Sequence, residues 1–262
     1  MKLYYRDQSA GIEVHLGDCL EVLPTLDAVD HVITDPPYSE HVHSKSRAGS
    51  RTLDRTGFIA DYSRAVDFGF DPVTEALRAG IAAIRAHRWT LVFSDVESAH
   101  LWSAALVCGG LDYVRTGAWV KLNGTPQFTG DRPGVGFEAV TICHPKGRKR
   151  WNGGGLPALW THAVVKNHPG QADTRLHPTQ KPIGLLIEQV EQFTDPGDLI
   201  LDPFMGSGTT LVAAKQLGRR AIGVELEEKW AEVAVKRLEA TTPPLFTLPS
   251  EKPVQGQMEV PA

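Results

Sequence analysis

The stretch VDHVITDPPYSEHV, residues 29–42, contains the strand on which the predicted fold is centred. Its first half consists mainly of β-branched and apolar residues, which favour a strand that is buried on both faces. The strand must stop at Asp35, because Pro36 cannot donate to a sheet ladder and restricts the residue before it to an extended conformation. Open α/β sheets bind their ligands at the carboxyl ends of such strands, so we expect a site at Asp35.

The four residues DPPY at the end of this strand offer three different binding groups. The carboxylate of Asp35 accepts hydrogen bonds, and the Tyr38 ring has a flat face for stacking. Pro37 holds Pro36 extended, which fixes the direction of the Pro36 carbonyl group. Together these groups can hold a planar ligand that carries an amino group. A plain strand followed by a proline turn, with Tyr38 packed on the core, is the alternative that these residues alone leave open.

Predicted strands and helices alternate along the rest of the chain. This alternation indicates a doubly wound α/β fold with a mostly parallel sheet. The helix expected at residues 71–88 has an acidic start, apolar residues at helical spacing and a basic end. Further strands are expected at residues 12–18, 89–95, 113–122, 137–144, 198–202 and 219–226, and further helices at residues 19–26, 96–108, 182–193, 210–218 and 227–240.

The length of 262 residues fits one large α/β domain, which we expect over residues 1–240. A basic insert is expected at about residues 144–176, and the proline-rich residues 241–262 are expected to form a disordered tail. No apolar run approaches the length of a membrane span, and the first residues lack a signal-peptide core. The sequence therefore predicts a cytoplasmic protein with no membrane partner.

The spacing of cysteine and histidine residues indicates neither a disulfide framework nor a metal site. Cys19, Cys108 and Cys143 lie far apart without a CxxC pair, and the ten histidines form no HExxH pattern. We therefore expect no bound metal, and unpaired cysteines fit a reducing cytoplasm.

Positive charge is unevenly distributed, although the formal net charge is −4. Residues 41–64 contain five Lys and Arg against two acids, and residues 144–181 contain seven against one. Such runs are often solvated surface, but one of these adjoins the DPPY segment, so nucleic acid is a candidate partner. The predicted DNA-binding residues are Lys45, Arg47, Arg51, Lys146, Arg148, Lys149, Arg150 and Trp151.

A second candidate site is the sequence LDPFMGSGTT, residues 201–210, which is typical of a strand, a glycine-rich loop and a helix. Gly206 and Gly208 remove side chains where a ligand would approach the backbone and the helix N-terminus. The sequence is not a P-loop, because no Lys follows Gly208. It also lacks the third glycine of the dinucleotide fingerprint, since Leu211 stands there.

Two acids flank this glycine loop and narrow the class of ligand. Asp202 precedes the loop, which is unfavourable for a pyrophosphate and suits the ammonium of an amino acid. Glu225 ends the next predicted strand, where an acid commonly binds ribose hydroxyls. A ligand with a ribose, a cationic amino acid and no phosphate is S-adenosylmethionine. A plain strand, turn and helix is the alternative.

Three motifs in a fixed order resemble those of the amino-group DNA methyltransferases. They are DPPY at residues 35–38, HPTQKP at residues 177–182 and DPFMGSGTT at residues 202–210. The order is similar to the permuted beta arrangement of that family, in which a target-recognition region lies between the two halves. The resemblance covers about residues 14–238 and implies a Rossmann-like methyltransferase fold, a double-stranded DNA substrate and a role in restriction-modification, and it allows a homodimer.

The resemblance implies a role for each matching residue. Asp35 and the Pro36 carbonyl would accept hydrogen bonds from the amino group of a flipped base, with Pro37 in the same catalytic segment and Tyr38 stacked on the base. The cofactor S-adenosylmethionine would be held by Asp35 and by the following residues: Asp18 near the adenine, Lys181 near the carboxylate, Glu225 at the ribose, and Asp202, Phe204, Gly206, Ser207, Gly208 and Thr209 around the methionine part.

Other functions remain to be weighed against adenine methylation. Enzymes that methylate the exocyclic amine of cytosine more often carry Ser at the position of Asp35, so adenine is favoured. A release-factor glutamine methyltransferase has Asn there and its glycine motif comes first. A dehydrogenase needs the missing third glycine, and a non-catalytic DNA-binding module of the same fold would be expected to carry damaged motifs, whereas all three are intact here.

Overall fold

The computed structural model describes most of the predicted domain. The described residues are 2–37, 80–81, 83–124, 130, 133–166, 175–177 and 179–244. In these ranges no helix has the length and apolar character needed to cross a lipid bilayer.

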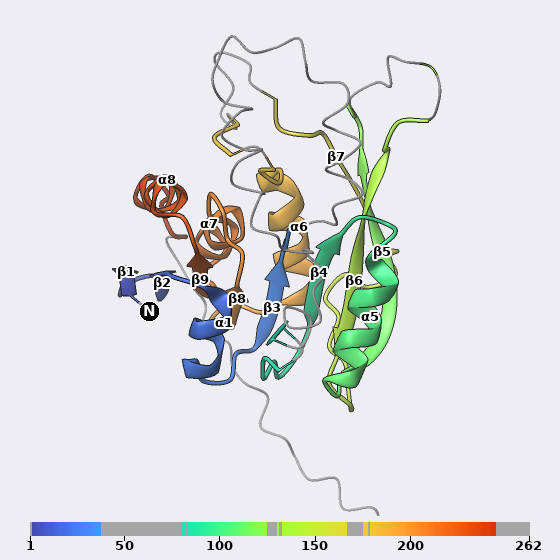
Figure 1. Ribbon diagram of the computed structural model, residues 1–262, viewed down its shortest axis with the longest axis horizontal. Coiled ribbons are helices and arrows are strands. Elements are labelled where there is room, and N and C mark those ends of the chain that lie inside the picture. Colours follow the sequence, from blue (N-terminus) through green and yellow to red (C-terminus); the bar gives the residue numbers. More distant parts are fainter. Residues whose placement is uncertain are drawn as a thin grey trace, which may run out of the picture.

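The described residues form one nine-stranded sheet with the order β1-β2-β9-β8-β3-β4-β6-β5-β7. Only β1 and β6 run against the direction of the other strands (Figure 1), so the mostly parallel sheet that the sequence predicts is confirmed. The strands are β1 (Lys2–Asp7), β2 (Ile12–Leu16), β3 (His31–Thr34), β4 (Thr90–Ser94), β5 (Asp112–Lys121), β6 (Phe137–His144), β7 (Leu159–His162), β8 (Leu199–Asp202) and β9 (Arg220–Glu225).

The strand order reverses between β3 and β8, in the middle of the sheet. From β3 the chain continues to β4 on one side, whereas β8 is followed by β9 on the other side. The loops that leave two such neighbouring strands diverge, which opens a crevice at their carboxyl ends. Asp35 follows one of these strands and Asp202 ends the other, so both predicted motifs meet at this switch point.

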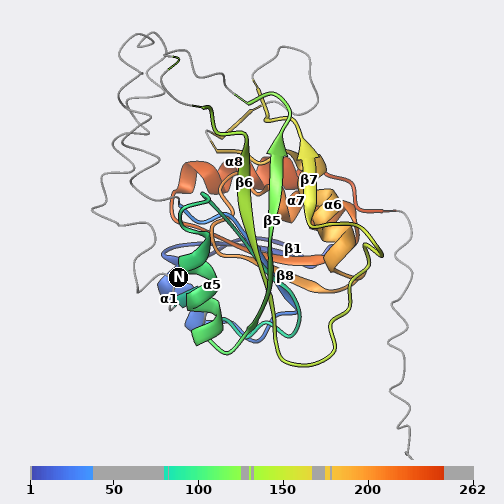
Figure 2. The same cartoon turned by 90° about the vertical axis from the view of Figure 1, so that its right-hand side faces the viewer.

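Helices cover both faces of the sheet. The short α1 (Cys19–Val22), the 3-10 turn η1 (Leu23–Thr25) and α5 (Ala99–Cys108) lie on one face. On the other face lie α6 (Ile183–Phe193), α7 (Thr209–Gln216) and α8 (Glu228–Glu239). Figure 2 shows these two layers on either side of the sheet.

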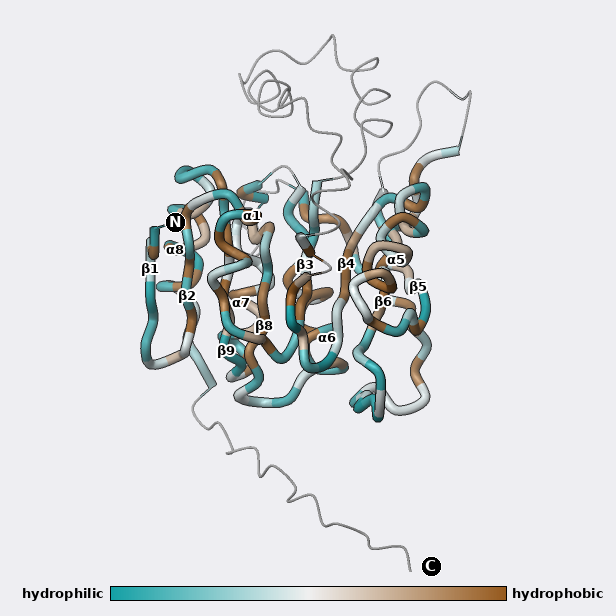
Figure 3. The backbone as a smooth tube through the Cα atoms, turned by 60° about the horizontal axis from the view of Figure 1, so that its bottom comes forward, coloured by the Kyte–Doolittle hydropathy of each residue, from teal (hydrophilic) through white to brown (hydrophobic). Residues whose placement is uncertain are grey.

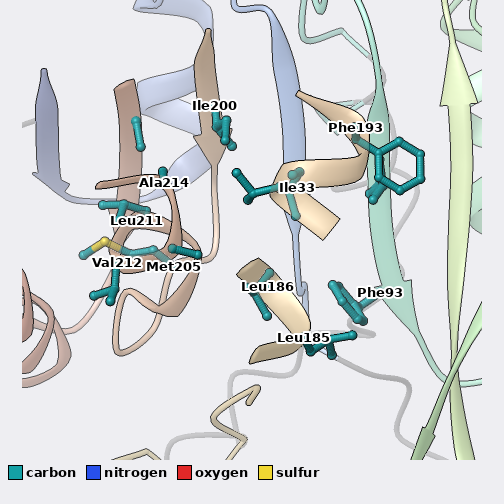
Figure 4. Close-up of a cluster of buried hydrophobic side chains, with 14 of the residues drawn as sticks. Ile33, Phe93, Leu185, Leu186, Phe193, Ile200, Met205, Leu211, Val212 and Ala214 are labelled. Carbon is teal, nitrogen blue, oxygen red and sulfur yellow. The ribbon is translucent and has the colours of Figure 1, made fainter. Parts of the chain in front are cut away.

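Alternate residues of the central strands supply the two hydrophobic cores. Ile33 and Phe93 pack toward α6 and α7, whereas Val92 packs against Trp102 of α5. Figure 4 shows Leu185, Leu186 and Phe193 of α6 beside Ile33 and Phe93. Brown, hydrophobic stretches of the tube accordingly gather in the central elements of Figure 3, while the edge strand β1 is teal. A strand with apolar residues on both faces is fully buried, as the sequence of β3 predicts.

One predicted helix ends earlier than expected, and two strands were not predicted. The predicted helix does not reach residue 88, because the Arg85 carbonyl accepts a hydrogen bond from Val29 N and the Val29 carbonyl accepts one from His87 N. Residues 85–88 therefore pair with the chain just before β3 through a parallel bridge between Val29 and Ala86, while residues 71–79 lie outside the described chain. Strand β1 and strand β7, which lies inside the predicted insert, were not expected from the sequence.

Candidate functional site

A buried hydrogen bond joins the carboxyl ends of β3 and β8. The Thr34 hydroxyl donates to Asp202 Oδ1 at 2.8 Å, and the backbone N–H of Phe204 donates to the same oxygen at 3.1 Å. Asp202 is only 3% exposed, so its carboxylate acts inside the crevice and not at the surface. The bond keeps the two strand ends together where their loops diverge.

Asp35, the next residue along the chain from Thr34, forms an ion pair with a lysine from the HPTQKP segment. Lys181 Nζ lies 2.5 Å from Asp35 Oδ2 and 3.1 Å from Glu138 Oε2. Pro36 is buried behind the carboxylate and Pro37 is exposed. The resemblance placed Lys181 near a cofactor carboxylate, but here its ammonium contacts the candidate catalytic acid.

The glycine loop is joined to the end of β9 by Glu225. Glu225 Oε2 accepts a hydrogen bond from Gly206 N at 3.1 Å, and Oε1 accepts one from Glu227 N at 2.8 Å. Asp18 lies beside this strand end, because Gly17 N donates to the Glu225 carbonyl at 2.9 Å. The exposed Asp18 carboxylate also caps α1 by accepting from Leu20 N.

Burial favours the neutral, protonated form of both acids that the sequence predicts to bind the cofactor. Desolvation raises the pKa of Asp202 to about 6, although hydrogen bonds from Thr210 and Thr34 oppose the shift. Desolvation raises the pKa of Glu225 to about 7, against hydrogen bonds from backbone N–H groups. A cationic ligand or a ligand rich in hydroxyl groups would restore the carboxylate forms, because both stabilise negative charge.

The two glycines of the loop serve different purposes. Gly206 has φ +51°, and a Cβ added there would make an ordinary van der Waals contact with the His177 ring at 3.7 Å, so this backbone lies directly beneath the HPTQKP segment. Gly208 has φ +75°, and an added Cβ would lie 2.8 Å from Ala234 Cβ. The missing side chain of Gly208 therefore makes room for helix α8, while the approach of a ligand to its backbone stays a prediction.

Arg237 of α8 holds the rest of the glycine loop. Its Nη1 donates to the Ser207 carbonyl, to Ser207 Oγ at 3.0 Å and to Thr209 Oγ1 at 3.0 Å. Ser207 and Thr209 are buried, so their hydroxyl groups support the loop. Phe204 is half-buried and packs against the apolar cluster below α1 and α5.

The start of the HPTQKP segment closes over this loop. The His177 ring meets Trp230 of α8 edge-on, with ring centroids 4.3 Å apart. Desolvation, helped by the nearby positive charge of Lys181, lowers the pKa of His177 to about 4. The imidazole is therefore neutral at physiological pH and forms an uncharged wall beside the acids.

The basic cluster, defined as Lys146, Arg148, Lys149 and Arg150, lies at the opposite edge of the sheet. Since β6 is antiparallel to β4, its last residues lie beside the first residue of β4, with Cys143 paired to Thr90. Arg150 forms an ion pair with Asp195 before β8, and Lys149 forms one with Asp112 at the start of β5. Figure 2 shows β5 and β6 side by side, and because they are antiparallel, β6 ends at the edge of the sheet where β5 begins.

The basic cluster therefore lies away from Asp35, because β6 returns the chain to the amino ends of the parallel strands, and its contact with DNA stays a prediction. Trp151, predicted to contact DNA, instead anchors the loop: its ring meets Phe193 edge-on at 4.7 Å and its indole N–H donates to the Gly154 carbonyl. The other predicted contacts, Tyr38, Lys45, Arg47 and Arg51, lie outside the described residues.

Several site residues were missed by the sequence analysis. Thr34, Glu138 and Arg237 contact Asp202, Lys181 and the glycine loop respectively. A signal existed for Glu138, because a charged residue in the strand-forming run FEAVTICH requires a partner when the strand is buried.

The edge thus gathers four acids around the switch point: Asp18, Asp35, Asp202 and Glu225. A pyrophosphate would be repelled here, whereas a ribose, an ammonium and a sulfonium fit this charge. The carboxylate acceptors and the backbone that a glycine at position 206 exposes to a ligand agree with the cofactor expected from the sequence. Among the residues that the structure describes, no three His, Cys, Asp or Glu side chains gather as a metal site.

Comparisons with known proteins find similar chains among the DNA methyltransferases. A family model described as DNA methylase matches residues 29–236. The type II methyltransferase M.HinfI of Haemophilus influenzae is 28% identical over 250 residues, which span 87% of this chain and 68% of that protein. The crystal structure of the M1.HpyAVI–SAM complex has a TM-score of 0.63 and 25% identity, and the match covers 87% of this chain and 98% of that one.

A second solved structure shares the fold at lower identity. The cytosine-N4-specific PvuII DNA methyltransferase has a TM-score of 0.63 at 14% identity, over 87% of this chain and 86% of that one. Solved relatives of this architecture therefore include an enzyme that acts on cytosine.

The packing at Gly208 predicts a loss of stability when a methyl group is added. Gly208→Ala should lower the free energy of unfolding by about 2–4 kcal/mol, because it combines left-handed strain with a clash against Ala234. Gly206→Ala, the matched control, should cost only about 1–2 kcal/mol, because its added Cβ would make only an ordinary van der Waals contact with the His177 ring. Urea unfolding of the three proteins measures the difference, and equal losses in the two variants would contradict this role for Gly208.

Proposed function

The chain belongs to the N6/N4 family of DNA methylases, and from this membership we propose that it transfers a methyl group from S-adenosylmethionine to the exocyclic amino group of adenine in double-stranded DNA. The observation that carries the proposal is the position of Asp35. Its carboxylate lies at the topological switch point, beside the acids of the cofactor crevice, and is fixed there by Lys181.

Asp35 is proposed to act on the target amino group directly. A carboxylate and the carbonyl of the buried Pro36 are both acceptors, so together they can bind the two N–H groups of an exocyclic amine. Accepting these hydrogen bonds orients the nitrogen lone pair and stabilises the positive charge that grows on the nitrogen during transfer. Tyr38 is proposed to stack on the base, which must leave the helix because its amino group is otherwise unreachable.

The cofactor is S-adenosylmethionine, which supplies an electrophilic methyl group on a sulfonium. Glu225 is proposed to accept hydrogen bonds from the ribose hydroxyl groups, as it already accepts two from backbone N–H groups. Asp202 and the backbone at Gly206 are proposed to border the methionine part, and Asp18 the adenine. His177 and Trp230 would exclude water from above the loop.

Adenine is proposed as the target base because position 35 is Asp. In the family pattern, enzymes that methylate cytosine more often carry Ser there, and this chain does not. The PvuII enzyme shares the fold, so the fold itself does not separate the two substrates. The exocyclic amine of cytosine is therefore the competing target, and the chemical product decides between them.

DNA is proposed to approach the carboxyl edge of the sheet, where Asp35 lies. Lys45, Arg47 and Arg51 follow Pro37 closely in the sequence, so we propose that they contact phosphates near the flipped base. Within the predicted insert at residues 144–176, β7 runs parallel to β5 and returns the chain to this edge. Target recognition is therefore proposed for the residues that follow His162. Assembly into a homodimer stays a prediction.

The first test is the product of methylation in DNA. Genomic DNA from cells that express the protein should contain N6-methyladenine when its nucleosides are analysed by mass spectrometry. Asp35→Ala should lower kcat by about 10²–10³-fold, because it removes the acceptor that stabilises the growing charge. Substantial turnover by Asp35→Ala would refute the role of this residue, and N4-methylcytosine as the product would refute adenine as the target.

The raised pKa of Glu225 predicts a pH dependence of cofactor binding. The carboxylate form binds the ribose, so the Kd for S-adenosylmethionine should rise, by up to tenfold per pH unit, as pH falls below about 7. Glu225→Gln should bind about 10–100-fold more weakly at pH 8, and its Kd should lose most of this dependence between pH 8 and pH 6. Calorimetry measures both quantities, with the exposed Glu232→Gln on α8 as the control.

The placement of the basic residues predicts which of them create salt-dependent binding to DNA. Replacing Lys45, Arg47 and Arg51 by Ala should reduce the log–log salt slope by about 0.9 for each phosphate that is no longer neutralised. The corresponding quadruple variant of the basic cluster should leave the slope unchanged, because this cluster lies at the far edge of the sheet. A flatter slope in the quadruple variant, measured on duplex DNA, would restore the cluster as a DNA-binding surface.

A further inference from the structure

The ammonium group of Lys181 is enclosed by partners from four strands. Beside Asp35 at the end of β3 it meets Glu138 Oε2 of β6 at 3.1 Å. It also lies over the Phe93 ring of β4, 5.2 Å from the ring centroid, and 5.8 Å from the centroid of the Trp119 ring. An ammonium has three N–H donors, and in this setting its partners fix their directions.

Glu138 binds a second lysine with its other oxygen. Lys121 Nζ of β5 lies 2.7 Å from Glu138 Oε1 and 5.4 Å from the centroid of the Trp119 ring. The carboxylate of Glu138 therefore bridges two ammonium groups, and four alternating charges run from Asp35 to Lys121. With two acids and two lysines, the formal charge of this row is zero.

Burial gives this row of charges its strength. The side chains of Lys181, Glu138 and Lys121 are only 8%, 12% and 17% exposed, so bulk water screens them little. Breaking one buried pair leaves an uncompensated charge, which is strongly unfavourable. Burial alone would lower the pKa of Lys181, but Asp35 and Glu138 more than offset it and raise this pKa above its ordinary value.

We propose that Glu138 is a positioning residue for methyl transfer: it holds the Lys181 ammonium against Asp35 Oδ2 and so fixes the direction in which Asp35 meets the target amino group. This inference rests on the proposed function, because Asp35 is the residue through which Glu138 acts. In the transfer, the N–C bond forms as the C–S bond breaks, the sulfur keeps the C–S electron pair as a neutral thioether, and the amino nitrogen then releases one proton to water. A carboxylate that is held in place needs no reorganisation as positive charge grows on that nitrogen.

The position of Glu138 in the sheet makes this role specific. Glu138 lies opposite Trp119 in the β5–β6 ladder, and its side chain lies on the face of the sheet where it meets Lys121 and Lys181. Lys181 precedes the buried Pro182 that caps α6, which places the base of its side chain but not the ammonium at its tip. Four rotatable side-chain bonds separate that ammonium from the backbone, so its place at Asp35 depends on Glu138 and the two rings.

Glu138→Gln tests the proposal because the amide keeps the shape and loses the charge. We expect kcat to fall about 10–100-fold, since small misplacements of reacting groups cost this much, while KM for the cofactor and for DNA changes less than about threefold. The pH profile provides a second measurement. With one carboxylate removed, the pKa of Lys181 should fall, so kcat of the variant should decline at alkaline pH where the wild type does not.

A double variant separates positioning from charge balance. Lys121→Gln combined with Glu138→Gln restores the neutral sum of the row but not the contact to Lys181. If Glu138 acts by positioning, the double variant stays as slow as Glu138→Gln, whereas recovery of wild-type kcat would overturn the proposal. Glu188→Gln is the matched control, because Glu188 also forms an ion pair, with His162, but does not contact Lys181. Its kcat should stay within about twofold of wild type.

The remaining outcomes are separated by measurements on the wild type. If the wild-type protein methylates no amino group in DNA, the proposed function itself fails. If it does methylate DNA, and Glu138→Gln folds and binds the cofactor with wild-type kcat and pH profile, only the role of Glu138 fails. Should Glu138→Gln not fold, Glu138→Asp decides: it keeps the charge but withdraws it by one methylene, so kcat should still fall about tenfold, and an unchanged kcat overturns the proposal.

Discussion

The ion pair between Asp35 and Lys181 joins segments that lie 146 residues apart in the chain, and most of the site is arranged around it. Asp35 reaches this place because β3 is buried between β8 and β4 and must end at a proline. Lys181 reaches it because α6 packs across the same strands through Leu185 and Leu186. The pair therefore depends on the docking of α6 on the sheet, and the acid is fixed only when that docking is complete.

The glycine loop shows how packing and ligand binding share a few residues. Gly206 donates its backbone N–H to Glu225, whereas the missing side chain of Gly208 makes room for Ala234 of α8, and Arg237 of the same helix donates to the Ser207 carbonyl. Helix α8 thus shapes the crevice without contributing an acid to it. The raised pKa values of Asp202 and Glu225 follow from this enclosure, since burial that shapes the crevice also removes water from the carboxylates.

The two edges of the sheet have different chemical character. The carboxyl edge gathers acids that suit a cationic cofactor, while the amino edge holds an ion-pair network in which Arg88 binds both Asp195 and Asp198, and His31 binds Asp198. Arg150 of the basic cluster joins this network. Charges at the amino edge therefore join loops to one another, and a positive run in the sequence is not by itself a sign of DNA contact.

The sequence by itself determined the central strands, the doubly wound class and the motifs around Asp35, Asp202 and Glu225. These features depend on local patterns: apolar runs, a proline stop and glycines in a short loop. Only the tertiary structure decided that the basic cluster lies away from the site and that Glu138 meets Lys181. The reason is strand direction. One antiparallel strand, β6, ends at the opposite edge and places one of its first residues, Glu138, beside the segment that precedes α6, and no local pattern encodes the direction of a strand.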